Sequence, residues 1–181
     1  MAARKIDQFC QKLFPDGAAR TERLSIAPLQ ASDAFQLVFL TNDPLVAGGL
    51  SLLRQPFTLS DAQDLIALSR MDKGCFAAIR RCEDDVFIGC AGALVRDEQD
   101  VEAGFWLGAP YHGKHYGEEA AQAMLDLLRR ALPGRRIVAE CPRENSASWR
   151  ILQRLGFTPC GAVGWRKGAQ LLAYKAPQTV C

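Results

Sequence analysis

The 181-residue chain has no apolar run that approaches membrane-spanning length, and its N-terminal stretch lacks the apolar core of a secretory signal. It also has little excess charge, because 22 basic residues stand against 20 acidic ones and the formal net charge is +2. This balance argues against nucleic acid or an anionic membrane as the main partner. We therefore expect a cytoplasmic protein.

Metal-binding patterns are equally scarce. The seven cysteines are scattered, odd in number and without a C-x-x-C pair, which predicts free thiols in a reducing compartment and neither a disulfide framework nor a zinc site. The chain has only two histidines, His112 and His115. Two ligands with no third candidate nearby make a poor metal site, so we expect no metal.

The composition that remains is typical of one globular domain, with 49% hydrophobic and 23% charged residues. Residues 1–20 form an N-terminal amphipathic extension, in which apolar side chains recur at helical spacing before Pro15. This stripe indicates either a helix that lies on the domain or a dimer contact, so both a monomer and a homodimer remain open. We assign the domain to residues 21–176 and a tail to residues 177–181.

The hydrophobic pattern predicts an α+β fold with a mixed sheet. Gly156 follows a helical stretch directly and is a typical left-handed helix terminator. The segment 42–58 is expected to be irregular, with two prolines and two glycines. The elements are expected in this order: a strand at 24–29, helices at about 34–40 and from 60, strands at 75–81, 86–95 and 101–107, a helix at about 117–131, a strand at 136–140, a helix at 146–155, and strands at about 157–163 and 170–175.

The stretch from Glu102 to Ala120 is the most informative part of the chain. A strand ends at Leu107, a glycine-containing loop follows, and a helix begins near Gly117. Such a loop directs unpaired backbone N–H groups and the positive end of the helix dipole at one point. Lys114 adds a positive charge, so the pattern predicts a pyrophosphate site, although ordinary strand-to-helix turns are also often rich in glycine.

Two motifs in this order resemble those of the GNAT (N-acetyltransferase) superfamily. The segment His112–Gly117 resembles its coenzyme-A loop, R/Q-x-x-G-x-G/A. The run Asn145–Phe157 resembles its N-x-x-S…L-G-F helix in the RimJ/RimL-like branch. The resemblance covers about residues 21–175 and implies a GNAT-like mixed, splayed central sheet flanked by helices. It also implies an N-acetyltransferase that uses acetyl-CoA as co-substrate and acetylates a primary amine, on a protein N-terminus or a small molecule, by direct attack in a ternary complex.

The resemblance assigns roles to individual residues. Glu102 is the candidate base that deprotonates the amine through water, and Ser148 is the candidate group that protonates or hydrogen-bonds the departing thiolate. Each also has a plainer interpretation, as a solvent-facing strand glutamate and as a serine bonded to its own helix backbone. The residues expected to contact coenzyme A are Phe105, Trp106, Leu107, His112, Gly113, Lys114, His115, Tyr116, Gly117 and Asn145.

The chain departs from the family pattern at three positions. His112 replaces the loop arginine, which removes a fixed charge and a fork of donors. His115 replaces the central glycine, and a side chain there costs about 1–2 kcal/mol if the backbone is left-handed. Leu152 replaces a tyrosine common in the second helix. The alternative function is therefore a degenerate GNAT domain that binds acyl-CoA or a protein partner without catalysis.

Four further expectations concern side chains around this site. The two histidines, when protonated, are expected to replace part of the missing charge, so that coenzyme-A affinity rises as the pH falls from about 8 to about 6. Trp149 is the best candidate for lining a pocket, whereas Trp106 is assigned to core packing. Cys141 is expected to be a buried spectator. The arginines either reach the 3′-phosphate of coenzyme A or form a solvated face: Arg135, Arg136, Arg143, Arg150 and Arg154.

Overall fold

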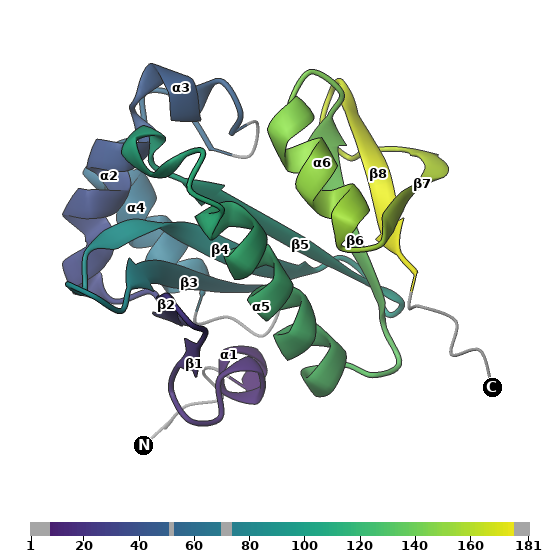
Figure 1. The fold of residues 1–181 in the computed structure, drawn as a ribbon, viewed down its shortest axis with the longest axis horizontal. Helices are drawn as coiled ribbons and strands as arrows, with labels where there is room; N and C mark the ends of the chain where they lie inside the picture. The colour runs from purple at the N-terminus through teal and green to yellow at the C-terminus, as the bar shows by residue number, and fades with distance from the viewer. Residues whose placement is uncertain (1–7, 51–52, 70–73, 176–181) are drawn as a thin grey trace.

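Eight strands form one continuous sheet at the centre of the molecule (Figure 1). The computed structural model describes residues 8–50, 53–69 and 74–175. Neighbouring strands follow the order β1-β2-β3-β4-β5-β6-β8-β7. In chain order the strands β1 to β8 are Ala19–Arg20, Leu24–Pro28, Gly74–Arg81, Phe87–Val95, Asp100–Leu107, Arg136–Pro142, Phe157–Val163 and Ala169–Tyr174.

The parallel neighbours β5 and β6 give the sheet its mixed character, and helix α5 (Tyr116–Ala131) connects them. Their pairing is short and ends at Glu102 opposite Val138. Beyond that point β5 stays paired with β4 as far as Leu107, while β6 stays paired with β8 as far as Pro142. The two strands therefore diverge, which confirms the predicted α+β fold with a mixed, splayed sheet.

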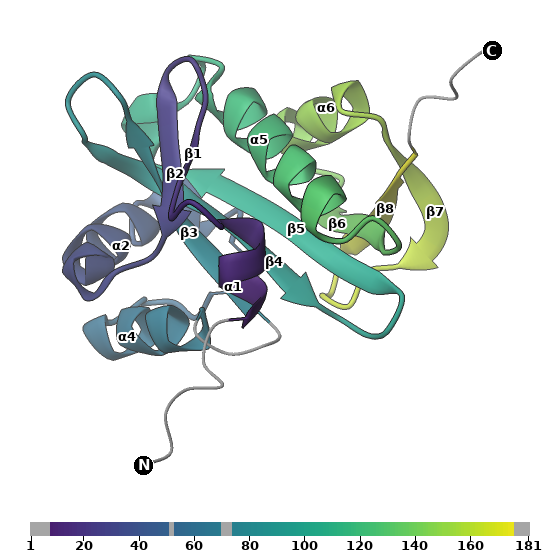
Figure 2. The ribbon, with the colours of Figure 1, turned by 90° about the horizontal axis from the view of Figure 1, so that it is seen from below.

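Helices cover both faces of this sheet. Figure 2 shows α5 and α6 (Ser146–Arg154) on one face, and α2 (Ala34–Thr41) and α4 (Leu59–Leu68) on the other. No helix among residues 8–50, 53–69 and 74–175 is long and apolar enough to cross a membrane. The layers thus follow because each of these four helices buries apolar side chains against one side of the strands.

The strand sequences explain why the sheet has two cores. In β3, alternate side chains point to opposite faces, as the period of a strand requires. Ile79 packs with the α5 core, and Phe76 and Ala78 pack with the α2 and α4 core. Because both faces are covered, β3 and β4 are buried along most of their length and are almost continuously apolar.

Local sequence sets the ends of α5 and the start of α4. α5 carries acidic residues in its first turn and basic residues in its last turn, as its dipole favours. α4 (Leu59–Leu68) begins one residue earlier than predicted, because Thr58 provides its cap. The Thr58 side chain accepts from the Asp61 amide at 3.2 Å, and Asp61 accepts from the Thr58 amide at 2.7 Å. This reciprocal pair is a capping box.

The N-terminal helix α1 (Gln8–Leu13) lies on the domain, which is the plainer of the two interpretations of its apolar stripe. Phe9, Leu13 and Phe14 are at most 6% exposed and belong to the α5 core. These side chains are therefore buried within their own chain and are not free for a dimer contact. Ile6, the first residue of the predicted stripe, lies outside the described residues.

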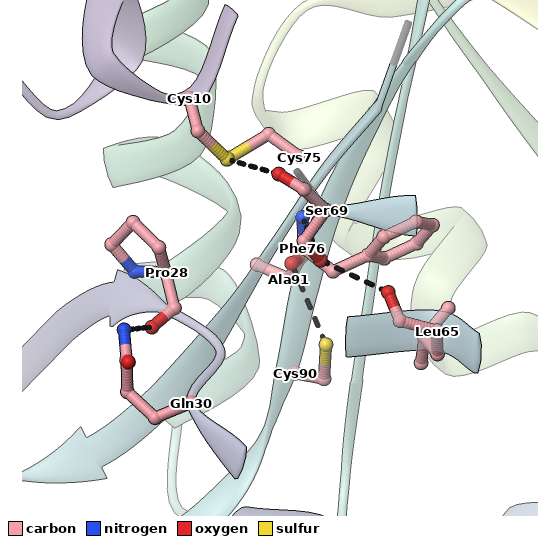
Figure 3. The surroundings of a disulfide bond; sticks show 9 residues. All are labelled: Cys10, Pro28, Gln30, Leu65, Ser69, Cys75, Phe76, Cys90 and Ala91. Carbon is pink, nitrogen blue, oxygen red and sulfur yellow. Dashed lines mark hydrogen bonds between the residues drawn. A yellow bond between two sulfur atoms is a disulfide. The ribbon is translucent and has the colours of Figure 1, made fainter. Parts of the chain in front are cut away.

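A disulfide joins α1 to the sheet (Figure 3). It links Cys10 of α1 to Cys75 of β3, and the Cys10 sulfur lies 3.1 Å from the carbonyl oxygen of Ser69. The prediction that all cysteines are free thiols is therefore wrong for this pair. Sequence spacing gave no signal, because the two residues are 65 positions apart and meet only when α1 packs on β3. The free cysteines among the described residues are Cys82, Cys90, Cys141 and Cys160.

Two short elements were not predicted. Helix α3 (Pro44–Ala47) interrupts the segment expected to be irregular, and Asp43 caps it by accepting from the Leu45 amide at 2.9 Å. Strand β1 lies inside the assigned extension and pairs with β2. Both are too short to produce a periodic hydrophobic pattern, so only the cap residue or a pairing partner reveals them.

Candidate active site

The divergence of β5 and β6 leaves one edge of β5 without a partner strand. Gly104 is exposed although it lies in the middle of the sheet, and nothing stands within 4 Å of the position a side chain would take there. At the base of the opening, Arg136 of β6 holds Asp100 of β5 through contacts of 2.6 and 2.7 Å. An exposed stretch of strand at the sheet centre marks a cleft.

The loop from β5 to α5 contains a row of free amides beside this cleft. The amides of Gly113 through Gly117 donate to no protein acceptor within the described residues. The His112 amide is different, because it donates to the Ala109 carbonyl at 3.1 Å. The row of free donors therefore begins at Gly113, one residue after the start of the loop motif, and it leads directly into the N-terminus of α5.

His115 adopts the left-handed backbone conformation, in which a residue with a side chain is less stable than glycine. It is the residue before α5 and has φ 65°. Its side chain is 75% exposed, with Nδ1 3.9 Å from Glu118 Oε2. Because the imidazole points to solvent, it does not close the row of amides. The left-handed backbone is therefore present with its energetic cost, and the imidazole leaves the amides uncovered.

The other residues of the loop separate into two groups. His112 lies against the cleft, and its Nε2 is 2.8 Å from the Leu107 carbonyl oxygen. That contact requires a proton on Nε2, so His112 can donate from Nδ1 only when it is an imidazolium ion. Lys114 and Tyr116 do not line the cleft. The Lys114 carbonyl accepts from Arg23 at 3.1 Å, and the Tyr116 ring stacks under the Arg23 guanidinium at 4.6 Å.

Gly117, the second residue of α5, stands where a larger residue would not fit. A side-chain carbon at this position would lie 3.3 Å from both Ile151 of α6 and Phe105 of β5. Those contacts are tight, so glycine lets the start of α5 approach the strand and α6 together. The start of the helix, with its free amides, is therefore set deep against the cleft.

The cleft has two connected parts. The outer groove runs along the loop and is lined by His112, Gly113, Gly117, Ile151 and Arg154, among others. The inner pocket lies between β4, β5 and β6 and is lined by Phe76, Leu94, Glu102, Glu140, Leu152 and Arg166, among others. Six residues line both parts: Gly49, Leu50, Phe105, Trp106, Asn145 and Ser148.

Ser148 stands at the junction of the two parts. The Asn145 side chain caps α6 by accepting from the Ser148 amide at 3.2 Å. The Ser148 hydroxyl has no hydrogen-bond partner within the described residues, so it is not bonded to its own helix backbone. The structure therefore leaves this hydroxyl available at the point where the groove meets the pocket.

Glu102 is buried in the inner pocket and is 6% exposed, so the interpretation as a solvent-facing glutamate is wrong. Its Oε2 accepts from Arg96 Nε at 2.6 Å, and its Oε1 accepts from an Arg166 nitrogen at 2.7 Å. Arg166 also forms an ion pair with Glu140 of β6. A carboxylate has about four acceptor sites, so Oε1 keeps room for one more donor.

A family model for the acetyltransferase (GNAT) domain matches residues 23–158, which is most of the chain. The chain belongs to the GNAT acetyltransferase family. It is 32% identical over 144 residues to the uncharacterized N-acetyltransferase p20 of Bacillus licheniformis, a match that covers 76% of this chain and 80% of that protein. GNAT acetyltransferases use acetyl-CoA.

Solved structures support the fold of this GNAT protein. An acetyltransferase from Agrobacterium tumefaciens aligns with a TM-score of 0.74 at 22% identity, covering 88% of this chain and 94% of that one. A spermidine N-acetyltransferase from Vibrio cholerae, in complex with CoA and spermine, aligns with a TM-score of 0.70 at 13% identity, covering 84% and 94%. At these identities the comparison establishes the shared fold alone.

Several predictions about side chains of the GNAT cleft need correction. Trp106 packs against the α2 and α4 core, as expected, and it also lines the cleft. Trp149, the expected pocket residue, packs against the α5 core and lines neither part of the cleft. Arg150 and Arg154 line the outer groove. Arg135 and Arg136 instead bind the turn before β5 and the start of that strand, so they do not extend the groove.

Cys141 lies in the inner pocket, and burial raises the pKa of its thiol to about 11. The thiol therefore stays protonated near neutral pH, as expected for a spectator.

Leu152 is also buried in the pocket wall, at the position where the family pattern has tyrosine. The sequence had not indicated Arg96, Glu140 or Arg166, because strand pairing alone brings these residues together.

Proposed function

We propose that this chain is an acetyl-CoA-dependent N-acetyltransferase that acetylates a primary amine by direct attack in a ternary complex. The observation that carries the proposal is the junction of the cleft, where the free Ser148 hydroxyl separates the groove beside the amide-rich loop from the inner pocket. One substrate can enter from each side and meet at this residue. No residue is required to carry the acetyl group.

The residues of the outer groove fit coenzyme A. The free amides of 113–117 and the start of α5 match a pyrophosphate, which such helix N-termini bind readily. The unpaired edge of β5 after Glu102 offers backbone groups to an extended pantetheine arm. Arg150 lines the same groove and favours a further phosphate, whereas Arg154 there is paired with Glu118 at 2.8 Å. When bound, acetyl-CoA supplies the acetyl group as an activated thioester.

The inner residues would then serve the transfer itself. Acetylation requires an amine without its extra proton and a stabilised departing sulfur. Glu102 Oε1 can accept the amine's proton through a water molecule. The Ser148 hydroxyl can donate to the sulfur as the carbon–sulfur bond breaks. Leu152 contributes no acid, which leaves Ser148 as the donor at this point of the pocket.

We propose further that the protein belongs with the RimJ/RimL-like enzymes, since its α6 begins with the Asn145 to Ser148 pattern and carries no tyrosine at position 152. The near-neutral charge favours a small or peptidic amine in the cytoplasm over a nucleic acid or membrane partner. Both a monomer and a homodimer are compatible with this activity.

One experiment tests the proposed function. Purified protein is titrated with acetyl-CoA by calorimetry and then assayed for thiol release with a panel of primary amines. We expect binding and amine-dependent release, and we expect Ser148→Ala to reduce kcat by about tenfold or more with little change in acetyl-CoA affinity. Ser146→Ala, at an exposed position of the same helix turn, is the matched control. Binding without any release would favour the non-catalytic alternative.

A further inference from the structure

The inner pocket contains two buried carboxylates, and both are neutralised by arginines of this chain. Glu102 and Glu140 are accompanied by Arg96 and Arg166. Arg166 bridges the two carboxylates, with one nitrogen 2.7 Å from Glu102 Oε1 and another paired to Glu140. Two negative and two positive charges cancel, so this four-residue cluster has no net charge, with Arg96 pairing to Glu102 from outside the residues that line the pocket.

The arginines are held in place and are not free to move aside. The Arg166 backbone amide donates to Glu140 Oε1 at 3.1 Å, so the turn between β7 and β8 is bound at two points. Gly164 permits this approach, because a side-chain carbon there would lie 2.5 Å from Glu140 Oε1. The Arg96 guanidinium stacks on Trp165 at 4.7 Å. Contacts with the turn between β7 and β8 therefore hold both arginines beside the two carboxylates.

The remaining wall of the inner pocket is largely apolar. Phe76, Leu94, Phe105 and Leu152 line it beside the charged cluster. An ammonium group that enters such a pocket loses its water, and it needs a carboxylate partner to compensate. Here both carboxylates already have cationic partners. A substrate with a second positive charge close to its reacting amine would find no counter-charge.

We propose that the acceptor is a primary amine carried on an uncharged, mainly apolar body, and that Arg166 is the residue that sets this preference. The inference rests on the proposed N-acetyltransferase function and specifies its substrate class. Arg166 occupies the carboxylates that a diamine or polyamine would require. The pocket accepts one amine, whose extra proton leaves before attack, and rejects a second group that must remain charged.

Matched amine pairs test the wild-type protein directly. Hexylamine and 1,6-diaminohexane share a six-carbon chain and differ by one terminal ammonium. Tripeptides with phenylalanine or lysine at the second position repeat the comparison on a peptide. We expect kcat/KM to favour the member of each pair that has a single amino group by about tenfold or more. Equal or better use of the dicationic members would overturn the proposal, even if acetylation itself is confirmed.

A variant then assigns the preference to Arg166. In Arg166→Gln, Glu140 loses its cationic partner, and we expect the preference for hexylamine over 1,6-diaminohexane to fall by about tenfold. Arg129→Gln removes an ion-paired arginine on α5, outside the cleft, and should keep the wild-type ratio. Retained acetyl-CoA binding shows that the variant is folded. If the variant does not fold, the comparison of amine pairs on the wild-type protein still tests the substrate preference. An unchanged ratio in folded Arg166→Gln overturns the role of Arg166, whereas acetyl-CoA binding without acetylation of any amine refutes the proposed function as well.

Discussion

At the scale of single residues, the loop before α5 combines a good anion-binding arrangement with two unfavourable substitutions. The amides of 113–117 remain free, although the arginine expected at 112 and the glycine expected at 115 are both histidines. The His112 ring bonds the end of β5, and the His115 ring points to solvent. We therefore expect the binding of a phosphate group to depend mainly on the backbone amides, which a side-chain substitution alters only by changing the loop conformation.

Replacement of His115 tests the cost of that conformation. His115→Gly removes a side chain from a left-handed backbone position, whereas His115→Ala removes the imidazole and keeps the strained carbon. We expect the glycine variant to be more stable than the alanine variant by about 1 kcal/mol and to bind coenzyme A at least as tightly. Thermal denaturation and calorimetry measure both quantities. An alanine variant as stable as the glycine variant would mean that the strain is relieved elsewhere.

Cys141 gives a pH-dependent prediction at the same scale. Only the thiolate reacts with alkylating agents, and burial raises the pKa of this thiol to about 11. Its alkylation rate should therefore rise about tenfold per pH unit between pH 7 and 9, while the exposed Cys82 and Cys160 are modified earlier. Time-resolved mass spectrometry of iodoacetamide-treated protein follows each site. Fast modification of Cys141 at pH 7 would contradict its assignment as an inert thiol.

At the scale of elements, the turn between β1 and β2 is hydrogen-bonded to the loop that precedes α5 and to the first turn of that helix. Arg23 donates to the Lys114 carbonyl at 3.1 Å and to Glu119 at 2.7 Å, and Glu119 also accepts from the Thr21 hydroxyl at 2.5 Å. The same guanidinium stacks on Tyr116. These contacts hold the loop from behind, on the side away from the cleft.

Arg23 should therefore act as a positioning residue for acetyl-CoA. In Arg23→Ala the loop loses this support, and the free amides must be ordered at the moment of binding, which weakens affinity. We expect KM for acetyl-CoA to rise about tenfold with kcat nearly unchanged. Arg20→Ala, an exposed neighbour that forms no ion pair within the described residues, is the control. A fall in kcat without a change in KM would assign Arg23 a different role.

At the scale of the whole molecule, the sequence predicted the main elements and the position of the loop, because hydrophobic periodicity and helix signals are local. It could not predict which distant residues meet. Arg166 reaches Glu102 because β8 lies between β6 and β7 in the sheet, an order that no local pattern encodes. The packing of α1 on β3 was hidden for the same reason, and with it the pairing of Cys10 with Cys75.

The disulfide leads to a prediction for the entire fold. It closes a loop of 65 residues, and in the chain-entropy account such a cross-link stabilises the native state by about 4 kcal/mol. Reduction, or the double change Cys10→Ser with Cys75→Ser, should lower Tm by about 10 °C. The protein should still fold, because Phe9, Leu13 and Phe14 keep α1 attached through apolar contacts.

Thermal scans with and without a reductant measure this effect, and non-reducing peptide mapping identifies the linked cysteines. Cys82→Ser, at an exposed free cysteine, should keep both the wild-type Tm and its response to the reductant. A reducing cytoplasm would keep the pair as thiols, so the reduced form is the one whose acetyl-CoA binding should be measured alongside. If the reductant leaves Tm unchanged and mapping finds no linked peptide, α1 is held to the sheet by its apolar face alone.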